Sequence, residues 1–185
     1  MSRLIEKHFN LLAVGILLIG GIWIAASRVT PSDLAQARAA PQTGFLAPDF
    51  TLESFSGESV TLADLRGRPI LINLWASWCL PCRAEMPAIQ RVYDRYRNQG
   101  FQVLAINMTL QDNRNNARAF VDEFSLTFPI LLDVDGKVAA LYRLRALPSS
   151  YFVDANGIIQ DVVIGGPMDE ALLASRVEQL LEAGK

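Results

Sequence analysis

From residue 50 onward, short apolar or alternating runs, typical of strands, take turns with stretches in which apolar residues recur every three or four positions, typical of helices. Short apolar or alternating runs predict strands over residues 50–53, 59–62, 70–75, 101–107, 129–132, 151–154 and 158–164. Apolar side chains at helical spacing predict helices over residues 84–98, 117–124, 137–144 and 169–182. Strands and helices mixed in this order predict one α/β domain.

The predicted strand over residues 70–75 has the strongest pattern. It is an almost continuous apolar run, as expected for a strand that is buried on both faces of a sheet. The helix over residues 84–98 and the strand over residues 101–107 follow it, so the three elements form a βαβ unit. Parallel strands joined by a right-handed crossover are the default for such a unit.

Residues 11–26 form an apolar stretch with basic residues before and after it. A helix over this stretch and its margins would be about 30 Å long, which is enough to cross a bilayer. We expect an uncleaved anchor with its N-terminal side in the cytoplasm. A cleavable signal peptide with a small-residue site at 35–37 and a buried core helix are the alternatives. The predicted organisation is a cytoplasmic tail over residues 1–10, a transmembrane signal-anchor over 11–27, a tether over 28–45 and a folded domain over 46–185.

Composition and charge exclude several classes of function. The chain has two cysteines and a single histidine, His8, so it lacks the residues for a four-ligand Cys/His zinc site or a Ser-His-Asp or Cys-His hydrolase. Residues 41–185 hold 13 basic and 17 acidic side chains, a net charge of −4, which argues against nucleic acid as a partner. Arg91, Arg95 and Arg97 share a predicted helix with an aspartate and are interpreted as a solvated face.

Cys79 and Cys82 stand three positions apart, directly after the central predicted strand and at the start of a helix. Unpaired N–H groups at the helix N-terminus favour a thiolate over a thiol, so Cys79 is the predicted attacking nucleophile. Cys82, one turn further on, is the predicted resolving thiol that displaces a captured substrate. Pro81 fits the first turn, where its missing N–H costs nothing.

Other uses of the cysteine pair have less support in the sequence. A structural disulfide would close a loop of only four residues and constrain little of the unfolded chain. Covalent haem attachment needs a histidine after the second cysteine, where this chain has Arg83. A metal carrier would lack a third ligand beside the pair. We therefore expect no cofactor and no bound metal.

Four motifs give the folded part a family resemblance. They cover Ala47–Leu52, Leu62–Gly67, Trp75–Pro87, which contains the sequence Trp-Cys-Leu-Pro-Cys, and Leu147–Asp154. In these motifs the chain resembles the membrane-tethered thioredoxin-like proteins of the TlpA/ResA/CcmG group, within the thioredoxin and AhpC/TSA-like superfamily. The resemblance implies a thioredoxin-like fold with a central mixed sheet flanked by helices. The stretch over residues 107–145 resembles the insertion that is characteristic of this group. The N-terminal β-hairpin is predicted from the chain itself, because Ser56 and Gly57 separate the first two predicted strands.

The resemblance also implies roles for individual residues. Pro148 corresponds to a proline that follows a cis peptide bond and faces the sulfurs. Glu85 matches an acidic residue near the site, although its spacing alone fits an exposed helix position equally well. Asn73 stands where ordinary thioredoxins bury an aspartate, so Glu85 or a water would have to serve any general base step at Cys82. The residues expected to contact substrate are Trp78, Pro81 and Leu147.

These features predict a membrane-anchored thiol–disulfide oxidoreductase of the bacterial cytoplasmic membrane, with its catalytic domain on the extracytoplasmic side. The resemblance implies that it reduces protein disulfides, with apocytochrome c as one target, and that a transmembrane thiol relay supplies its electrons. A thiol peroxidase is one alternative, although Ala76 stands where peroxiredoxins have a threonine. A CxxC metal-binding or chaperone module is the other.

Overall fold

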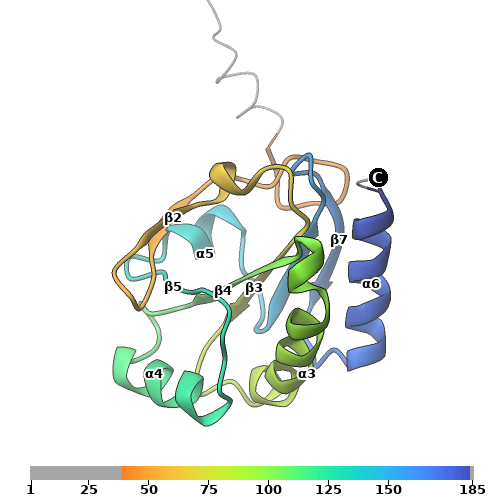
Figure 1. Ribbon diagram of the computed structural model, residues 1–185. Helices are drawn as coiled ribbons and strands as arrows, with labels where there is room; N and C mark the ends of the chain where they lie inside the picture. The colour runs from red at the N-terminus through yellow and green to blue at the C-terminus, as the bar shows by residue number, and fades with distance from the viewer. Residues whose placement is uncertain (1–38, 184–185) are drawn as a thin grey trace, which may run out of the picture. The chain divides into compact units, whose positions relative to one another are not determined.

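The computed structural model describes residues 39–183, which form an α/β domain (Figure 1). Its strands are β1 (Thr51–Glu53), β2 (Ser59–Thr61), β3 (Ile70–Trp75), β4 (Gln102–Asn107), β5 (Ile130–Leu132), β6 (Ser149–Val153) and β7 (Ile159–Ile164). Its α-helices are α3 (Leu80–Tyr96), α4 (Arg114–Glu123), α5 (Lys137–Leu141) and α6 (Glu170–Ala183). Two short 3-10 helices are η1 (Leu62–Leu65) and η2 (Arg97–Gln99).

Five strands form the central sheet, in the order β5-β4-β3-β6-β7. Strand β3 pairs in parallel with β4, and β4 pairs in parallel with β5. Strands β6 and β7 run antiparallel to their neighbours, so the sheet is mixed. Strands β1 and β2 form a separate antiparallel hairpin. The predicted α/β class, the parallel βαβ unit and the N-terminal hairpin are therefore confirmed.

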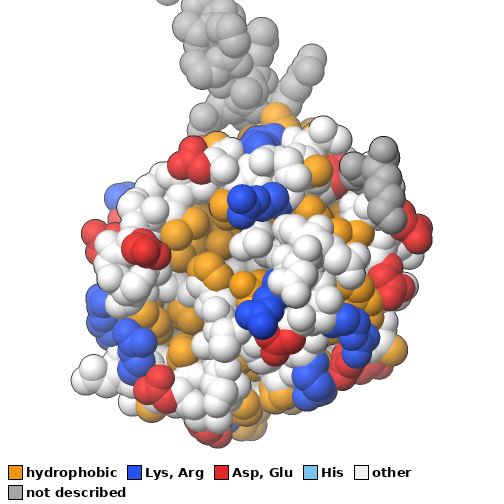
Figure 2. Space-filling model, viewed as in Figure 1, with side chains coloured by type: hydrophobic (Ala, Val, Ile, Leu, Met, Phe, Trp, Pro, Cys, Tyr) orange, Lys and Arg blue, Asp and Glu red, His pale blue; other side chains and the backbone are white. Residues whose placement is uncertain are grey.

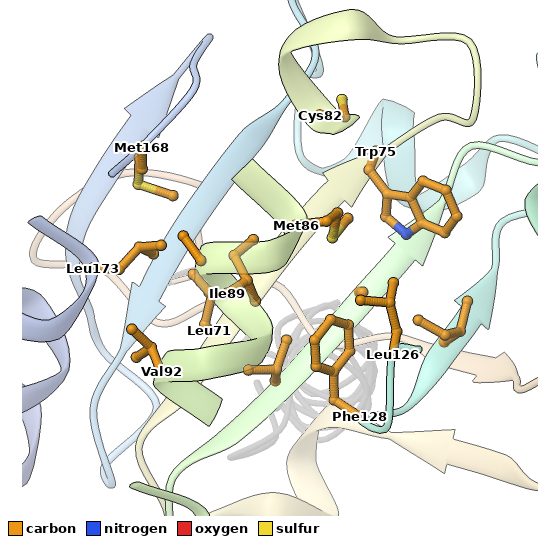
Figure 3. Packing of buried hydrophobic residues seen from close by; sticks show 14 of the residues in the cluster. Leu71, Trp75, Cys82, Met86, Ile89, Val92, Leu126, Phe128, Met168 and Leu173 are labelled. Carbon is orange, nitrogen blue, oxygen red and sulfur yellow. The ribbon is translucent and has the colours of Figure 1, made fainter. Parts of the chain in front are cut away.

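The two faces of the sheet carry separate hydrophobic clusters, because side chains alternate along each strand. Leu71 and Trp75 of β3 belong to one cluster, together with side chains from α3, α4 and α6 (Figure 3). Ile72 and Leu74 belong to the other, together with side chains from the hairpin and α5. Every residue of β3 is buried, as predicted for the central strand. This strand therefore carries its C-terminal end into the middle of the domain.

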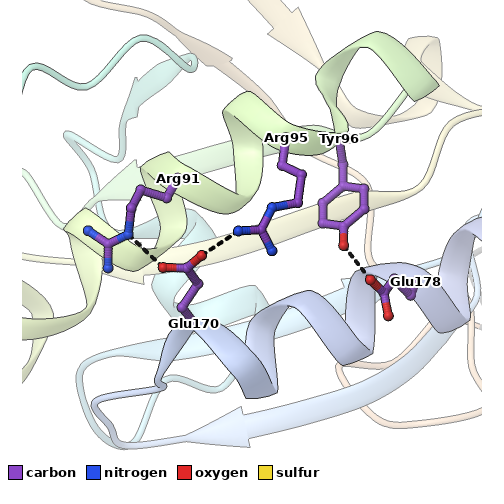
Figure 4. A network of polar contacts seen from close by, with 5 residues as sticks. All are labelled: Arg91, Arg95, Tyr96, Glu170 and Glu178. Atoms are coloured by element: carbon purple, nitrogen blue, oxygen red, sulfur yellow. Dashed lines mark hydrogen bonds and ion pairs between the residues drawn. The ribbon is translucent and has the colours of Figure 1, made fainter.

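Helices α3 and α6 are joined by polar contacts along their exposed sides (Figure 4). Arg91 and Arg95 of α3 both bond to Glu170 in the first turn of α6, each at 2.6 Å. Further along, the Tyr96 hydroxyl donates to Glu178. The arginines were predicted to lie on a solvated face, and they are about half exposed. Exposed ion pairs contribute little stability, so these contacts orient the two helices more than they stabilise them.

Helix α3 begins at Leu80, four residues before the helix that periodicity predicts. The Cys79 sulfur accepts a hydrogen bond from the Cys82 N–H and caps the helix, and Pro81 stands in the first turn. A cap formed by a cysteine sulfur adds no apolar side chain at helical spacing, so hydrophobic periodicity does not reveal this helix start. Helix α5 ends at Leu141, earlier than predicted, because the following residues turn back and Arg143 has a φ of 49°.

The predicted tail over residues 1–10 and the predicted anchor over residues 11–27 lie outside the described residues. Within residues 39–183, no helix combines the length and the apolar character that a membrane crossing requires. The end of the predicted tether hydrogen-bonds to β7: the Gly44 N–H donates to the Ile159 carbonyl, and the Ile159 N–H donates to the Phe45 carbonyl. These bonds bring the start of the described chain to the outer edge of the sheet.

Candidate functional site

The two cysteines lie where the central strand meets α3, and they form a disulfide with 5.3 Å between their Cα atoms. Cys79 is the N-cap of α3, and its sulfur lies 3.2 Å from the Cys82 nitrogen. Cys79 has 4% of its surface exposed and Cys82 has none. The first sulfur therefore sits at the positive end of a long helix and is the more accessible of the two, as the sequence predicted.

A groove of about 590 Å³ opens beside Cys79. Its residues come from the loop before α3, the helix start, the segment after β4 and the loop before β6: Trp78, Cys79, Leu80, Pro81, Gln111, Leu144, Arg145, Ala146 and Leu147. All three residues predicted to contact substrate are among them. Leu80 and Trp78 are among the most exposed large apolar side chains of the described region, at 78% and 55%. Exposed apolar surface beside a reactive sulfur suits an unfolded polypeptide segment.

The peptide bond between Leu147 and Pro148 is cis, as the resemblance implied. Leu147 lines the groove together with Cys79, whereas Pro148 is buried behind it. The Leu147–Pro148 peptide thus lies at the groove beside the first cysteine.

Glu85 is fully buried, so the reading that places it on an exposed helix face is wrong. Its Oε1 accepts a hydrogen bond from the Asn73 side chain at 2.8 Å, and its Oε2 accepts from the Met168 N–H at 3.1 Å. Burial raises the pKa of Glu85, and these two hydrogen bonds oppose the rise. Glu85 also follows Cys82 by three positions on α3, which places both side chains on the same helix face.

Asn73 points at Glu85 because it lies on the face of β3 that α3 covers. Both hydrogens of its side-chain nitrogen are used, one on Glu85 and one on the Ser150 hydroxyl at 2.9 Å. Its Oδ1 is buried and has no partner among the described residues. Asn73 therefore acts on Glu85 only as a donor, which favours the ionised carboxylate.

Asp112 holds the loop that leads to Cys79, and sequence reasoning did not single it out. Its carboxylate accepts from the Ser77 N–H at 2.7 Å, the Ser77 hydroxyl at 2.6 Å, the Asn107 side chain at 2.8 Å and the Asn113 N–H at 2.8 Å. The polar residues before α4 indicate a helix start. No local pattern signals a contact with a residue 35 positions away.

Replacing Asp112 with asparagine should destabilise the domain by about 1 kcal/mol at pH 7, since the carboxylate is only half-buried. Burial opposes ionisation of Asp112, but the hydrogen bonds from Ser77 and Asn107 outweigh it and lower the pKa. A lowered folded-state pKa stabilises above the unfolded value of about 3.9, and this contribution is lost as the pH falls through the folded pKa. Urea denaturation should thus show a larger difference from wild type at pH 7 than at pH 2. The exposed Asp122→Asn should match wild type at both, and equal stability of Asp112→Asn at pH 7 would contradict the assignment.

A second groove, of about 460 Å³, lies between the hairpin and α5, where Figure 2 shows hydrophobic side chains in a hollow. Phe50, Leu52, Val134 and Val138 are among its apolar residues. It shares no lining residue with the groove beside Cys79. Of these two grooves, only the first is lined by a cysteine.

Comparison with known proteins agrees with this geometry. The model of the AhpC/TSA family matches residues 43–162. Thioredoxin-like protein YneN of Bacillus subtilis is 42% identical over 125 residues, covering 67% of this chain and 72% of its own length. Thiol-disulfide oxidoreductase ResA of Oceanobacillus iheyensis is 38% identical over 144 residues, covering 76% of this chain and 71% of its own.

Solved structures that superpose on this domain are also thiol–disulfide proteins. A crystal structure from Chlorobium tepidum, described as a thiol:disulfide interchange protein DsbE, superposes with a TM-score of 0.69 at 31% identity, covering 76% of this chain and 98% of its own. A secreted Mycobacterium tuberculosis disulfide oxidoreductase, described as homologous to E. coli DsbE, superposes with a TM-score of 0.65 at 28% identity, covering 71% and 96%. These likenesses confirm the thioredoxin-like fold.

Proposed function

This chain belongs to the AhpC/TSA family and is a thiol–disulfide oxidoreductase of the ResA and DsbE type, and from that premise we propose that it reduces disulfides in extracytoplasmic proteins. The observation that carries the proposal is the position of Cys79. Its sulfur caps α3 and borders an apolar groove that is open to a polypeptide. A thiolate at that position can attack a disulfide held in the groove.

The reaction takes two exchanges. The Cys79 thiolate attacks one sulfur of the substrate disulfide, forming a mixed disulfide and releasing the other substrate sulfur as a thiolate, which takes up a proton. Cys82 then loses its proton and attacks the Cys79 sulfur. This step forms the Cys79–Cys82 disulfide and releases the second substrate sulfur. Two electrons pass from the enzyme dithiol to the substrate, and an external dithiol must return them.

In this proposal Glu85 takes the proton from Cys82. It is buried beside the resolving cysteine on one helix face, and its raised pKa brings it nearer the pH at which it works. Asn73 cannot accept a proton, so Glu85 is the only side chain of this buried network with that capacity.

Glu85→Gln should slow the release step by about 10²-fold at pH 7, because glutamine keeps the shape but accepts no proton. Stopped-flow decay of a preformed mixed disulfide measures this step across pH. The wild-type rate should fall toward acidic pH as Glu85 becomes protonated, whereas the glutamine variant should lose that dependence. Glu58→Gln, on the exposed hairpin, should behave as wild type. An unchanged pH–rate profile in Glu85→Gln would remove Glu85 from the mechanism.

The direction of electron flow is tested by the reduction potential of the Cys79/Cys82 couple, equilibrated against glutathione. A reductant should lie nearer the thioredoxin value of about −270 mV than the DsbA value of about −120 mV. A potential near the DsbA value would show that the protein oxidises its partners and would overturn the proposed direction.

The proposal places the domain outside the bacterial cytoplasmic membrane, held by residues 11–27, with a transmembrane thiol relay as donor and the haem-binding cysteine pair of apocytochrome c as one substrate. The support is the apolar stretch with its basic flanks and the family of the chain. The test expresses the full chain with Cys82→Ala in cells. Protease added to spheroplasts should digest the domain, and protection from the protease would contradict the proposed location.

The same variant should carry apocytochrome c as a mixed disulfide. Adducts with cytoplasmic proteins alone would contradict the proposed substrate.

A further inference from the structure

The segment from Gly165 to Met168 links β7 to α6 and contacts two buried residues of the site, Pro148 and Glu85. The Gly165 N–H donates to the Pro148 carbonyl oxygen at 2.8 Å. The Met168 N–H donates to Glu85 Oε2 at 3.1 Å. One short segment thus holds a carboxylate on α3 and a proline before β6, which are far apart in the sequence. Met168 also packs in the same apolar cluster as Cys82 and Met86 (Figure 3).

Gly166 lies between these two contacts, where there is no room for a side chain. A Cβ atom on Gly166 would lie 2.9 Å from Pro148 Cγ, which is closer than such atoms pack, and 3.0 Å from Glu85 Oε2, which would have to shift slightly. The other glycines in residues 39–183 have positive φ angles that favour glycine, whereas Gly166 does not. Space, and not backbone conformation, therefore explains a glycine at this position.

We propose that Gly166 is a positioning residue for the thiol–disulfide reaction, because its bare backbone lets the Glu85 carboxylate and the Pro148 ring both approach the position that a Cβ atom would occupy. The inference rests on the proposed role of Glu85 beside Cys82 and deepens it. The groove wall that carries Leu147 and the buried proton acceptor are then set by one backbone position.

The effect of a side chain at Gly166 on Glu85 has a definite sign. Few groups act on this carboxylate: Asn73 from β3 and the Met168 N–H donate to it, Cys82 shares its helix face, and no lysine or arginine among residues 39–183 pairs with it. A methyl group at Gly166 would lie 3.0 Å from Glu85 Oε2, so the carboxylate would have to shift, and its 3.1 Å hydrogen bond from the Met168 N–H would weaken. Weakening a donor to the charged form raises the pKa of a carboxyl group.

The test is Gly166→Ala in the full chain, purified in detergent and oxidised, with the Glu85 carboxyl followed by carbon-13 NMR against pH. Its titration should move up by about one pH unit, as expected for weakening one hydrogen bond to a carboxylate. The acid limb of the release step should move by the same amount in Gly166→Ala. In the Glu85→Gln background, where the acid limb is lost, Gly166→Ala should leave the pH profile unchanged. The catalytic efficiency toward a peptide disulfide should fall about tenfold as the groove wall shifts.

Two controls separate positioning from loss of stability. Gly57→Ala has open space at its Cβ but a φ of 85°, so it destabilises the hairpin without touching the site. It should leave the Glu85 titration unchanged. In a Glu85→Asp background the shorter carboxylate withdraws from Gly166, so Gly166→Ala should lower the melting temperature less than it does in wild type. This comparison covers the case in which Gly166→Ala folds poorly.

An unchanged Glu85 titration in a folded Gly166→Ala variant would overturn the proposal. So would equal destabilisation in both backgrounds. Failure of the proposed function is recognised separately, because Glu85→Gln would then release substrate at the wild-type rate. The NMR titration of the oxidised protein requires no catalysis and still decides whether Gly166 positions Glu85.

Discussion

Replacing Cys79 with serine should lower the rate of disulfide reduction by at least about 10³-fold, which is the scale seen when an enzyme loses its nucleophile. The serine hydroxyl is nearly isosteric with the thiol, but it remains protonated at neutral pH and does not attack a disulfide. The helix cap should persist, because an oxygen at this position also accepts the N–H that the Cys79 sulfur accepts here. The loss is therefore one of chemistry and not of folding. Reduction of a fluorescent peptide disulfide measures it.

Cys82→Ser is the matched control, since it removes the other sulfur of the same pair. It should still capture substrate through Cys79 at a rate close to that of wild type, but it should stop at the mixed disulfide, which mass spectrometry detects. Capture by Cys79→Ser and not by Cys82→Ser would reverse the two roles. Turnover by both variants at wild-type rate would exclude the dithiol mechanism.

The second large effect is on stability: Phe120→Ala should lower the free energy of unfolding by about 3–5 kcal/mol. Phe120 is almost fully buried on α4, and its ring lies 4.5 Å from that of Trp75 and 4.7 Å from that of Phe124. Arg83, from the first turn of α3, lies over the same ring. Removing the ring leaves a cavity where the central strand meets the insertion, and the surroundings cannot fill it completely.

Thermal and urea denaturation of the oxidised protein measure this effect, and the melting temperature should fall by on the order of 10 °C. Phe45→Ala is the control, because Phe45 is 46% exposed and its substitution removes less buried apolar surface. Its cost should stay well below that of Phe120→Ala. A loss under 1 kcal/mol for Phe120→Ala would show that α4 adds little to the core, and that the insertion is an appendage.

Local pattern predicted most elements because each carries its own signal. Strand β3 was predicted from its apolar run alone, since a central strand buried on both faces has no place for alternation. The start of α3 was missed, because a cysteine caps it and the first turn faces the site more than the core. The C-terminal end of α5 was also missed, since apolar residues after Leu141 continue the helical spacing although they lie in a turn.

The cysteine pair and its place after the central strand were readable in the sequence, because both cysteines lie within one short stretch. Of the groove residues, Trp78, Pro81 and Leu147 were predicted, whereas Gln111 and residues 144–146 come from other segments and were not. The burial of Glu85 was not, since either helix face would satisfy the local pattern until β3 places Asn73 opposite it. The same holds for Asp112 and Gly166. Their partners lie in other elements, and only the closed sheet brings them within reach. The sequence by itself determined which atoms react, whereas the tertiary structure decided which groups surround them, because contacts between distant segments leave no periodic trace in either segment.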